Sequence, residues 1–214
     1  MRTEIVRTLE EAGQTLALRR RGEDYDVILG NVVLLSSAAL GTELAFGRLV
    51  AEIAPGAARV LVGGLGFGAT VRGVLDVSGP GTEVIVVEKL AAIEELARGE
   101  LAHLAGRPLD DPRVRIVRAD VADVIAKERE LGAILLDVDN GPEWASFRSN
   151  ARLYGAAGLE AAREALATGG AYAVWSGYRA DPFLARLRAA GLRPRAIELR
   201  DKGIVQARAY VGTR

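Results

Sequence analysis

Short apolar runs alternate with amphipathic stretches through most of this chain. From Ala58 onward, runs rich in β-branched residues predict strands, and most are followed by a stretch whose apolar residues recur at helical spacing. The predicted strands cover residues 59–62, 83–87, 113–117, 132–136, 170–175, 194–199 and 205–211. The predicted helices cover residues 69–76, 90–104, 121–128, 155–167 and 181–190. Such alternation predicts a mostly parallel sheet with helices on both faces.

The N-terminal part follows a different pattern. Two short strand-like runs, Thr15–Leu18 and Tyr25–Leu29, flank a polar segment over residues 19–24 that begins with an arginine triplet. This pattern predicts a β-hairpin whose arginines lie in a solvated turn, with an anion-binding patch as the alternative. Residues 37–53 then carry apolar side chains at helical spacing and end near a Pro-Gly pair, so we expect a helix there.

The C-terminal end also departs from simple alternation. A short polar connection, residues 200–203, separates the last two predicted strands, which predicts an antiparallel hairpin. We therefore expect an α/β fold in two parts. A small β-hairpin region covers residues 1–36, and a larger domain covers residues 37–214.

Composition narrows the classes of function. Half of the 214 residues are apolar, which provides for a well-buried core, and the 28 basic and 28 acidic side chains cancel. Zero net charge argues against a nucleic acid or a membrane as the main partner. The chain has no cysteine and one histidine, and its acids show no metal-ligand spacing, so we expect no metal site. No apolar run is long enough to span a bilayer, so we expect a cytoplasmic protein that acts on a small molecule.

A glycine-rich turn is the most informative motif. The apolar run Val60–Val62 ends in residues 63–68, which read Gly-Gly-Leu-Gly-Phe-Gly, and a helical pattern follows at once. Glu88 ends the next apolar run, 20 residues after Gly68. Glycines let a backbone approach a ligand closely, and an acid at the neighbouring strand tip can bind ribose hydroxyls. The layout therefore predicts a nucleoside or nucleotide site.

Two further acids follow predicted strands. Asp120 comes after the run 114–117 and precedes a helix, and Asp137 comes after the very apolar run 133–136. Each acid alone is weak evidence for a ligand site, because an acid such as Asp120 is more often a helix N-cap. With the glycine turn and Glu88, however, they place polar groups along the carboxyl edge of the sheet, where α/β proteins bind ligands.

This order of motifs resembles that of class I S-adenosylmethionine-dependent methyltransferases, and more closely that of the spermidine synthase family. The similar segments lie between about Leu16 and Trp175 and comprise Val60–Arg72 with its Thr-x-Arg ending, Asp111–Val114, Asp137–Pro142 and Leu153-Tyr154. The resemblance implies a Rossmann-like, seven-stranded methyltransferase sheet, mostly parallel with an antiparallel last strand. It also implies a β-stranded N-terminal part, a homodimer, and S-adenosylmethionine or its decarboxylated form as the donor.

The resemblance further implies roles for individual residues. Glu88 would hold the ribose hydroxyls, and Asp120, with the backbone of Val121 beside it, would accept from the adenine amino group. Asp137 would face the reacting end of the donor. The turn residues that would surround the sulfonium portion are Gly64, Leu65, Gly66, Phe67 and Gly68.

Three positions depart from the family pattern, the mildest of them near Leu34, and two of them affect the expected chemistry. Phe67 stands where polyamine synthases place an aspartate that binds the amine end of decarboxylated S-adenosylmethionine, so a carboxylate for an ammonium is lost. Asn140 stands where the family has the acid that takes the proton from the attacking amine, and an amide cannot act as a base near neutral pH. Asp137 remains, and Asp139 is adjacent as a substitute, although alternation along an extended segment would point it elsewhere.

Candidate contacts for the acceptor come from three segments. Glu43 lies in the predicted N-terminal helix, where a solvated surface position is the alternative interpretation. Trp144 follows a Gly-Pro loop and could form a wall of the acceptor pocket, with core or rim packing as the alternative. Tyr154 opens the next helix and could reach the acceptor. A glutamine that family members place after an N-terminal turn falls near Leu34.

Three functions fit these features. The first is a methyltransferase that uses S-adenosylmethionine itself, because methyl transfer depends mainly on positioning and needs no strong base when the acceptor is already nucleophilic. The second is a divergent aminopropyltransferase that makes polyamines, with Asp137 and Asp139 sharing the base and amine-binding roles. The third is a nucleoside-binding protein without catalysis. We expect a transferase, with methyl transfer to a small-molecule acceptor as the main interpretation.

Overall fold

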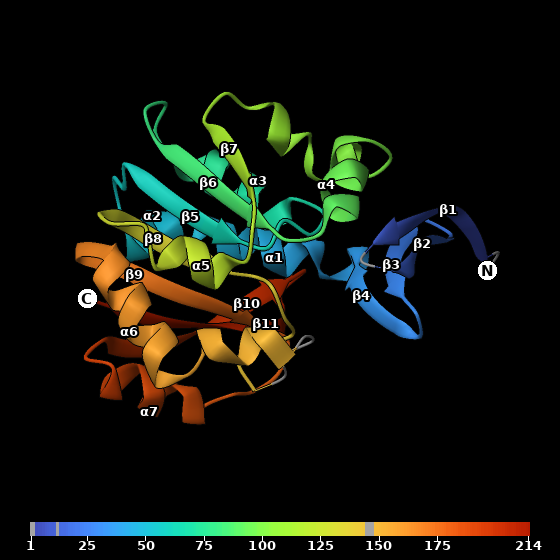
Figure 1. Ribbon diagram of the computed structural model, residues 1–214. Coiled ribbons are helices and arrows are strands. Elements are labelled where there is room, and N and C mark those ends of the chain that lie inside the picture. The colour runs from blue at the N-terminus through green and yellow to red at the C-terminus, as the bar shows by residue number, and fades with distance from the viewer. Residues whose placement is uncertain (1–2, 12, 144–147) are drawn as a thin grey trace.

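The chain folds into two β-sheets of different size (Figure 1). The structure, a computed structural model, describes residues 3–11, 13–143 and 148–214, with the side chains of the last range described from residue 150. The smaller sheet is N-terminal and blue in Figure 1, and the larger sheet begins at residue 59. Among the helices of these residues, none is long and apolar enough to cross a membrane.

The larger sheet has the order β10-β11-β9-β8-β5-β6-β7. Neighbouring strands from β9 across to β7 are parallel, whereas β11 is antiparallel to both β9 and β10. This topology confirms the predicted mostly parallel sheet with an antiparallel last strand. The strands are β5 (Arg59–Gly63), β6 (Glu83–Glu88), β7 (Val114–Arg118), β8 (Leu131–Leu136), β9 (Leu166–Ser176), β10 (Arg193–Asp201) and β11 (Ile204–Thr213).

Helices cover both faces of this sheet because its central strands are apolar on both sides. Along β5, Val60 and Val62 pack into one cluster of buried side chains, and Leu61 packs into the other. The first cluster is covered by α1 (Leu40–Arg48), α2 (Val50–Ile53), α3 (Ala69–Val77) and α4 (Ala91–Arg98). The second is covered by α5 (Val121–Ile125), α6 (Ala156–Ala165) and α7 (Pro182–Ala189).

Several helices are shorter than the periodicity predicts. The predicted helix 90–104 ends as α4 at Arg98, because Gly99 takes a non-helical conformation, and only a 3₁₀ turn, η2 (Ala102–Ala105), follows. The predicted helix 37–53 divides into the 3₁₀ turn η1 (Ser37–Ala39), α1 and α2. Two more 3₁₀ turns, η3 (Pro108–Asp110) and η4 (Arg148–Leu153), precede β7 and α6.

The N-terminal region is a four-stranded antiparallel sheet, larger than the expected hairpin. Its strands, in spatial order, are β1 (Thr3–Glu11), β2 (Gln14–Arg21), β3 (Asp24–Leu29) and β4 (Val32–Ser36). The arginine triplet lies within β2, so the turn that follows is only Gly22-Glu23. The expectation that these arginines lie in a solvated turn is therefore wrong.

Asp26 explains why arginines belong in β2. Its side chain is buried on β3, where it accepts hydrogen bonds from Arg19 Nη2 at 2.8 Å and Arg21 Nε at 2.7 Å. The Arg21 hydrogen bond, helped by Arg19, lowers the pKa of Asp26 to about 2 although burial opposes the shift. The two guanidinium groups thus compensate a carboxylate that the sheet has removed from water.

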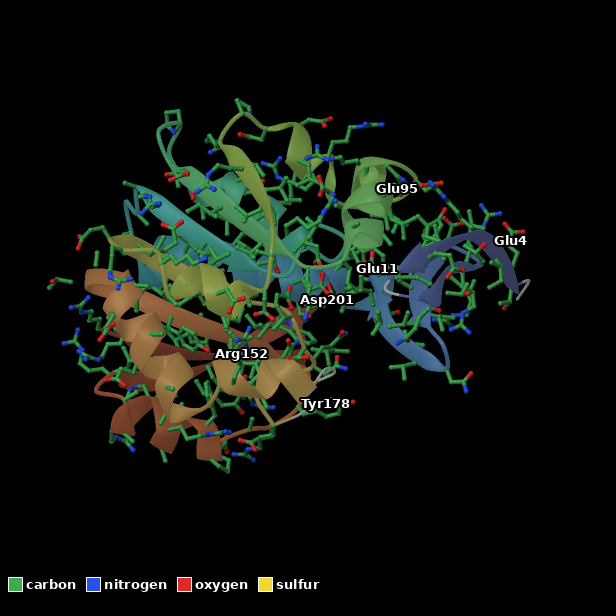
Figure 2. The ribbon with its side chains drawn as sticks, viewed as in Figure 1. Glu4, Glu11, Glu95, Arg152, Tyr178 and Asp201 are labelled. Carbon is green, nitrogen blue, oxygen red and sulfur yellow. The ribbon has the colours of Figure 1, made fainter. Side chains whose placement is uncertain are left out.

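The small sheet docks on the larger one through both apolar and charged contacts. Leu16 and Leu18 of β2 belong to the same buried cluster as β5. Glu11 lies at the junction between the small sheet and α4 in Figure 2, where its carboxylate accepts a 2.8 Å hydrogen bond from the Ala92 N–H in the first turn of α4. A carboxylate is favourable there because the first N–H groups of a helix lack intrahelical partners.

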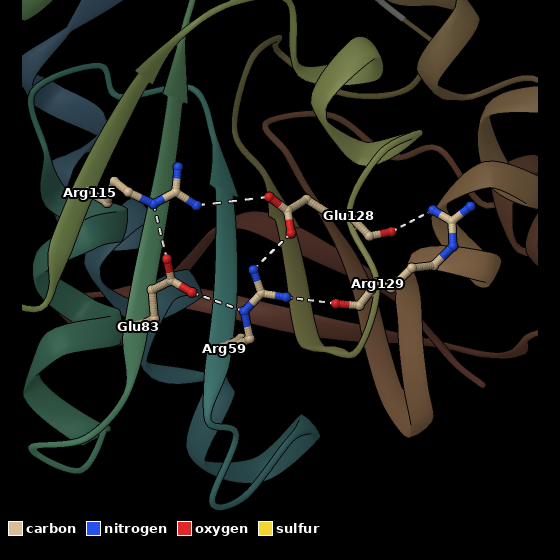
Figure 3. Close-up of polar contacts among 5 residues, drawn as sticks. All are labelled: Arg59, Glu83, Arg115, Glu128 and Arg129. Atoms are coloured by element: carbon tan, nitrogen blue, oxygen red, sulfur yellow. Dashed lines mark hydrogen bonds and ion pairs between the residues drawn. The ribbon is translucent and has the colours of Figure 1, made fainter.

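Ion pairs tie the amino ends of the parallel strands together (Figure 3). Arg59 of β5 binds Glu83 of β6 at 2.9 Å and Glu128 at 2.8 Å, and Arg115 of β7 binds Glu83 at 3.0 Å. A further hydrogen bond joins Arg59 to the Arg129 carbonyl. This network accounts for charged residues at the strand starts without assigning them chemistry, and it leaves the opposite edge for a ligand.

Candidate functional site

The glycine turn after β5 has a backbone that other residues adopt poorly. Gly64, Gly66 and Gly68 have φ values of +89°, +51° and +88°. A Cβ on Gly64 would lie 2.2 Å from the carbonyl oxygen of Asp137, so the turn and the end of β8 are in direct backbone contact. A Cβ on Gly66 would meet only Leu35, at 3.6 Å, because this glycine faces open space. The turn therefore combines close packing on one side with an accessible backbone on the other.

A cavity of about 290 Å³ lies at the carboxyl edge of the sheet, beside this turn. Its walls come from both sheets: Leu34 and Leu35 lie on β4, and the remaining residues belong to the larger domain. Those residues are Gly64, Gly66, Val87, Glu88, Lys89, Leu90, Ile93, Ala119, Asp120, Val121, Asp137, Val138 and Asn150. A mostly apolar pocket with a few convergent polar groups is typical of a small-molecule site.

Glu88 is held rigidly at the end of β6. Its Oε1 accepts hydrogen bonds from the backbone N–H groups of Lys89 at 2.7 Å and Leu90 at 2.8 Å, and its Oε2 accepts one from Leu65 at 3.0 Å. Burial raises the pKa of Glu88, and the three N–H donors oppose that rise. The carboxylate is thus fixed against the glycine turn, with acceptor capacity left for a polar group in the cavity.

Asp120 lines the same cavity as the glycine turn and has two roles at once. As the N-cap of α5 it accepts a 3.1 Å hydrogen bond from the Ala122 N–H, which is the structural role expected of an acid directly before a helix. Its Oδ1 is also 2.8 Å from Arg152 Nη2, and its Oδ2 is 3.5 Å from Lys89 Nζ. Burial raises the pKa of Asp120, but the Ala122 N–H and Arg152 outweigh it and the net shift is downward. Asp120 therefore lines the cavity as an ionised hydrogen-bond acceptor. Arg152 takes up part of its capacity to accept hydrogen bonds.

Two acidic residues, Asp137 and Glu43, lie beside Thr70 beyond the glycine turn. Asp137, at the end of β8, accepts a 2.5 Å hydrogen bond from the hydroxyl of Thr70. Burial nevertheless raises the pKa of Asp137 to about 6. Glu43 of α1 is close enough to act on Asp137 electrostatically, and burial together with Asp137 raises the pKa of Glu43 well above its usual value. The pair cannot be fully ionised without cost, which makes it a site for a cation or a proton.

The other acids and aromatics expected near the reaction lie elsewhere. Asp139 is buried and accepts hydrogen bonds from the Tyr154 hydroxyl at 3.0 Å and from Asn150 Nδ2 at 3.1 Å. Tyr154 itself is buried, and its ring packs edge-on against Phe183 at 6.0 Å, so it belongs to the core beneath the site. Asn140 is exposed outside the cavity, and Trp144 lies outside the described residues.

Three residues of the turn also differ from their expected positions. Phe67 and Leu65 are buried in the hydrophobic core and do not line the cavity. Leu65 still takes part through its backbone N–H, which binds Glu88. Gly68 packs against Pro108, where a Cβ would lie 2.7 Å from the proline ring. Gly64, Gly66, Glu88, Asp120, Val121 and Asp137, in contrast, are brought together around one cavity.

Several residues of the site cannot be recognised as site residues from the sequence. Leu34, Leu35 and Ile93 line the cavity with apolar side chains that look like ordinary core positions. Thr70 belongs to the glycine-rich motif without an evident role in the sequence, yet its hydroxyl contacts Asp137. Among the described residues, no group of three or more His, Asp or Glu side chains could hold a metal ion.

Known proteins resemble this chain in fold rather than in sequence. No family model and no curated protein matches the chain. Solved structures do: a spermidine synthase in complex with the transition state analogue AdoDATO and the spermidine synthase from Thermotoga maritima both superpose with a TM-score of 0.76. A probable spermidine synthase from Corynebacterium glutamicum ATCC 13032 superposes with a TM-score of 0.66.

The likeness extends over nearly the whole chain but is low in sequence. Each of the three structures is 18% identical to this chain and covers 98% of it. The match spans 72% of the first two neighbours and 80% of the third. The chain therefore has the fold of the spermidine synthases, a Rossmann-like, mostly parallel α/β sheet preceded by a small antiparallel sheet.

Proposed function

We propose that the chain is a transferase that binds an adenosyl-sulfonium donor in the cavity and passes the group on its sulfur to an amine. The adenosine portion fits the polar groups of the cavity: Glu88 binds the ribose hydroxyls, and Asp120 accepts from the adenine amino group. The apolar side chains of Leu90 and Val121 then flank the base. The sulfonium lies toward Gly64 and Asp137, where an exposed backbone and a carboxylate suit a positive centre.

The carboxyl pair of Glu43 and Asp137 is the observation that favours one transferred group over another. S-adenosylmethionine carries its own carboxylate near the sulfonium, and Asp137 at that end of the cavity, with Glu43 behind the cavity wall, repels it. Decarboxylated S-adenosylmethionine and an amine acceptor both bring positive charge, which the pair attracts. The three structural neighbours are spermidine synthases by name, and they support the same choice. Aminopropyl transfer is therefore the function that we favour, in place of methyl transfer.

The chemistry is an in-line displacement at carbon. The lone pair of the acceptor nitrogen attacks the methylene group bonded to the sulfonium, and the carbon–sulfur bond breaks with its electrons going to sulfur. A neutral thioether leaves. The protein contributes mainly by holding donor and acceptor in line and by stabilising the cationic centres.

Methyl transfer remains the second candidate because of Phe67. In this structure its ring lies in the core, so the position supplies no carboxylate for the aminopropyl amine of the donor. If the pair of Glu43 and Asp137 does not replace that carboxylate, the donor has no specific contact for an amine, and S-adenosylmethionine itself becomes the better ligand.

Calorimetry with three ligands separates these functions. We expect decarboxylated S-adenosylmethionine to bind at least about tenfold more tightly than S-adenosylmethionine, a difference of about 1.4 kcal/mol, with methylthioadenosine also bound. Tighter binding of S-adenosylmethionine would support methyl transfer. If all three ligands bind but neither donor is consumed with any of a panel of amines, the protein binds nucleosides without catalysis. If none binds, the proposal is wrong.

Glu88 provides the matching test of the site. Glu88→Ala is expected to weaken all three ligands, because each contains the same ribose. Glu83→Ala is the control: it removes an acid from the other end of the same strand, 2.9 Å from Arg59 and outside the cavity. Equal affinities in the two variants would remove Glu88 from the site.

A further inference from the structure

Asn150 contributes an amide to the wall of the cavity. It lies on η4 and lines the cavity together with Asp120 and Val138. Its Nδ2 donates a 3.1 Å hydrogen bond to Oδ1 of the buried Asp139. An amide has one donor side and one acceptor side, so the direction of this hydrogen bond decides which side is left for a ligand.

The carboxylate of Asp139 fixes the orientation of that amide. A carboxylate accepts hydrogen bonds, so it selects the NH2 side of Asn150 and leaves the carbonyl side facing elsewhere. The other carboxylate oxygen, Oδ2, accepts a 3.0 Å hydrogen bond from the hydroxyl of Tyr154, a buried residue of the core. None of the groups that the structure describes donates to Oδ1 of Asn150. That oxygen is therefore the polar atom that Asn150 has left for the cavity.

The segment that carries Asn150 is held beside Asp120. Arg152, two residues further along η4, lies 2.8 Å from Oδ1 of Asp120 at the start of α5. The carbonyl of Leu153 accepts a 3.4 Å hydrogen bond from the hydroxyl of Tyr172 on β9. η4 is thus fastened to α5 on one side and to the sheet on the other, which keeps Asn150 and Asp120 in the same wall of the cavity.

The contacts of Asp120 leave one of its oxygens for a ligand. Oδ1 accepts from the Ala122 N–H at 3.1 Å and from Arg152 at 2.8 Å. Oδ2 lies 3.5 Å from Lys89 Nζ, which is long for a hydrogen bond. Asp120 and Asn150 therefore each present one acceptor oxygen to the same cavity.

We propose that Asn150 makes the site specific for a purine that carries an exocyclic amino group. This inference rests on the proposed function, in which Asp120 accepts from the adenine amino group, and it adds a second acceptor for that group. The amino group has two hydrogens. One donates to Oδ2 of Asp120 and the other donates to Oδ1 of Asn150, so both are satisfied by the protein.

The same pair of oxygens excludes a base with a keto group. Hypoxanthine carries an oxygen where adenine carries its amino group. That oxygen can only accept hydrogen bonds, and it would face the two acceptors of Asp120 and Asn150 without a proton between them. The site therefore gains specificity both from two hydrogen bonds to the correct base and from repulsion of the wrong one.

The binding of two nucleosides to the full-length chain tests this specificity without requiring turnover. The probes are methylthioadenosine and methylthioinosine, which carry the amino and the keto base, and their affinities are compared by calorimetry. Wild type should bind methylthioadenosine at least about 100-fold more tightly. Asn150→Ala should reduce this ratio about tenfold, because the amino group loses one acceptor and the keto group loses one source of repulsion.

Asp139→Asn tests the orientation of the Asn150 amide. The hydroxyl of Tyr154 still donates to the oxygen of the introduced amide, so the introduced NH2 lies next to Asn150 and donates to its Oδ1. Asn150 then turns its own NH2 to the cavity. Methylthioinosine should bind more tightly than to wild type and methylthioadenosine more weakly, which lowers the ratio at least about tenfold. Asp139 does not line the cavity, and this variant alone decides if Asn150→Ala does not fold.

Asn31→Ala is the matched control for the loss of an asparagine side chain. Asn31 is exposed in the turn between β3 and β4 and does not line the cavity. Its ratio of affinities should agree with that of wild type within about twofold, as expected of a surface substitution.

The outcomes distinguish this inference from the proposed function. An unchanged ratio in Asn150→Ala or in Asp139→Asn, even with both nucleosides bound more weakly, means that Asn150 only fastens η4; the inference is then wrong and the proposed function stands. Equal affinities of wild type for the two nucleosides also overturn the inference, while consumption of an adenosyl donor with an amine still decides the proposed function. If wild type binds neither nucleoside, both proposals fail together.

Discussion

The hydroxyl of Thr70 donates a 2.5 Å hydrogen bond to Oδ2 of Asp137, joining the first turn of α3 to the end of β8. Thr70 is buried, and its hydroxyl also lies 3.2 Å from the Glu43 carbonyl, the longer of its two contacts. The contact favours the ionised form of Asp137 in a place where burial disfavours it. One hydroxyl therefore helps to decide the charge at the reacting end of the cavity.

Thr70→Val should raise the pKa of Asp137 above its value of about 6, because the carboxylate loses a donor while its burial is unchanged. Carboxyl-carbon NMR titration of the protein measures this shift. Thr82→Val is the control, since Thr82 is also buried and donates its hydroxyl to a carbonyl, that of Ala57, at 3.0 Å. An equal shift in both variants would mean that the hydrogen bond is not the cause.

Phe67→Asp should not restore the family's amine-binding carboxylate. The Phe67 ring is in the core, so an aspartate there would bury a charge without a partner and lower the free energy of unfolding by about 3 kcal/mol or more. Phe67→Leu should cost clearly less, because it keeps an apolar side chain. Urea denaturation of both variants measures the difference. A Phe67→Asp protein as stable as wild type, with tighter binding of decarboxylated S-adenosylmethionine, would contradict this placement of the ring.

Gly64→Ala should destabilise the glycine turn through two effects, and a second glycine separates them. Both Gly64 and Gly13 have positive φ, +89° and +78°, so alanine is strained at either position by about 1 kcal/mol. Only at Gly64 does the new Cβ also collide with a backbone oxygen, that of Asp137; at Gly13 nothing lies within 4 Å. Thermal unfolding should show a clearly larger loss for Gly64→Ala. Equal losses would show that backbone strain alone matters.

Asp26→Asn should weaken the N-terminal sheet by about 2 kcal/mol, because two arginines lose a charged acceptor. The pH dependence has a definite sign. The pKa of Asp26 is lowered from 3.8 to about 2, so its stabilisation is present above pH 4 and is lost as pH falls through 2. Urea unfolding of wild type should therefore show this loss between pH 4 and 2, and Asp26→Asn should not. The same acid dependence in both proteins would assign it to other groups.

The larger sheet could be predicted from the sequence because its strands are short apolar runs with glycines or acids at their ends. Of the N-terminal sheet only the hairpin of β2 and β3 could be predicted, since β1 carries charges such as Arg7 and Glu11 on a strand only partly covered by the protein. Those charges have partners far along the chain, Glu100 for Arg7 and the Ala92 N–H for Glu11, which no local pattern reveals. Because of these charges, the sequence pattern did not predict β1. It predicted a turn where the arginines of β2 lie.

The candidate site was predictable where it follows strand ends and unpredictable where it depends on side-chain direction. Glu88, Asp120 and Asp137 line one cavity because parallel strands end at the same edge. The inward turn of Phe67 and the internal contacts of Asp139 are set by tertiary packing, so spacing along the chain could not distinguish them from pocket residues.

The small sheet supplies Leu34 and Leu35 to a cavity whose other walls belong to the larger domain. A molecule bound there contacts both sheets at once, so its binding free energy also opposes their separation. The coupling is reciprocal: ligand should slow amide exchange in the strands over residues 3–36, and loosening those strands should speed release of the ligand. The N-terminal strands should thus influence how long a ligand stays bound, although none of their described residues contributes a polar side chain to the cavity.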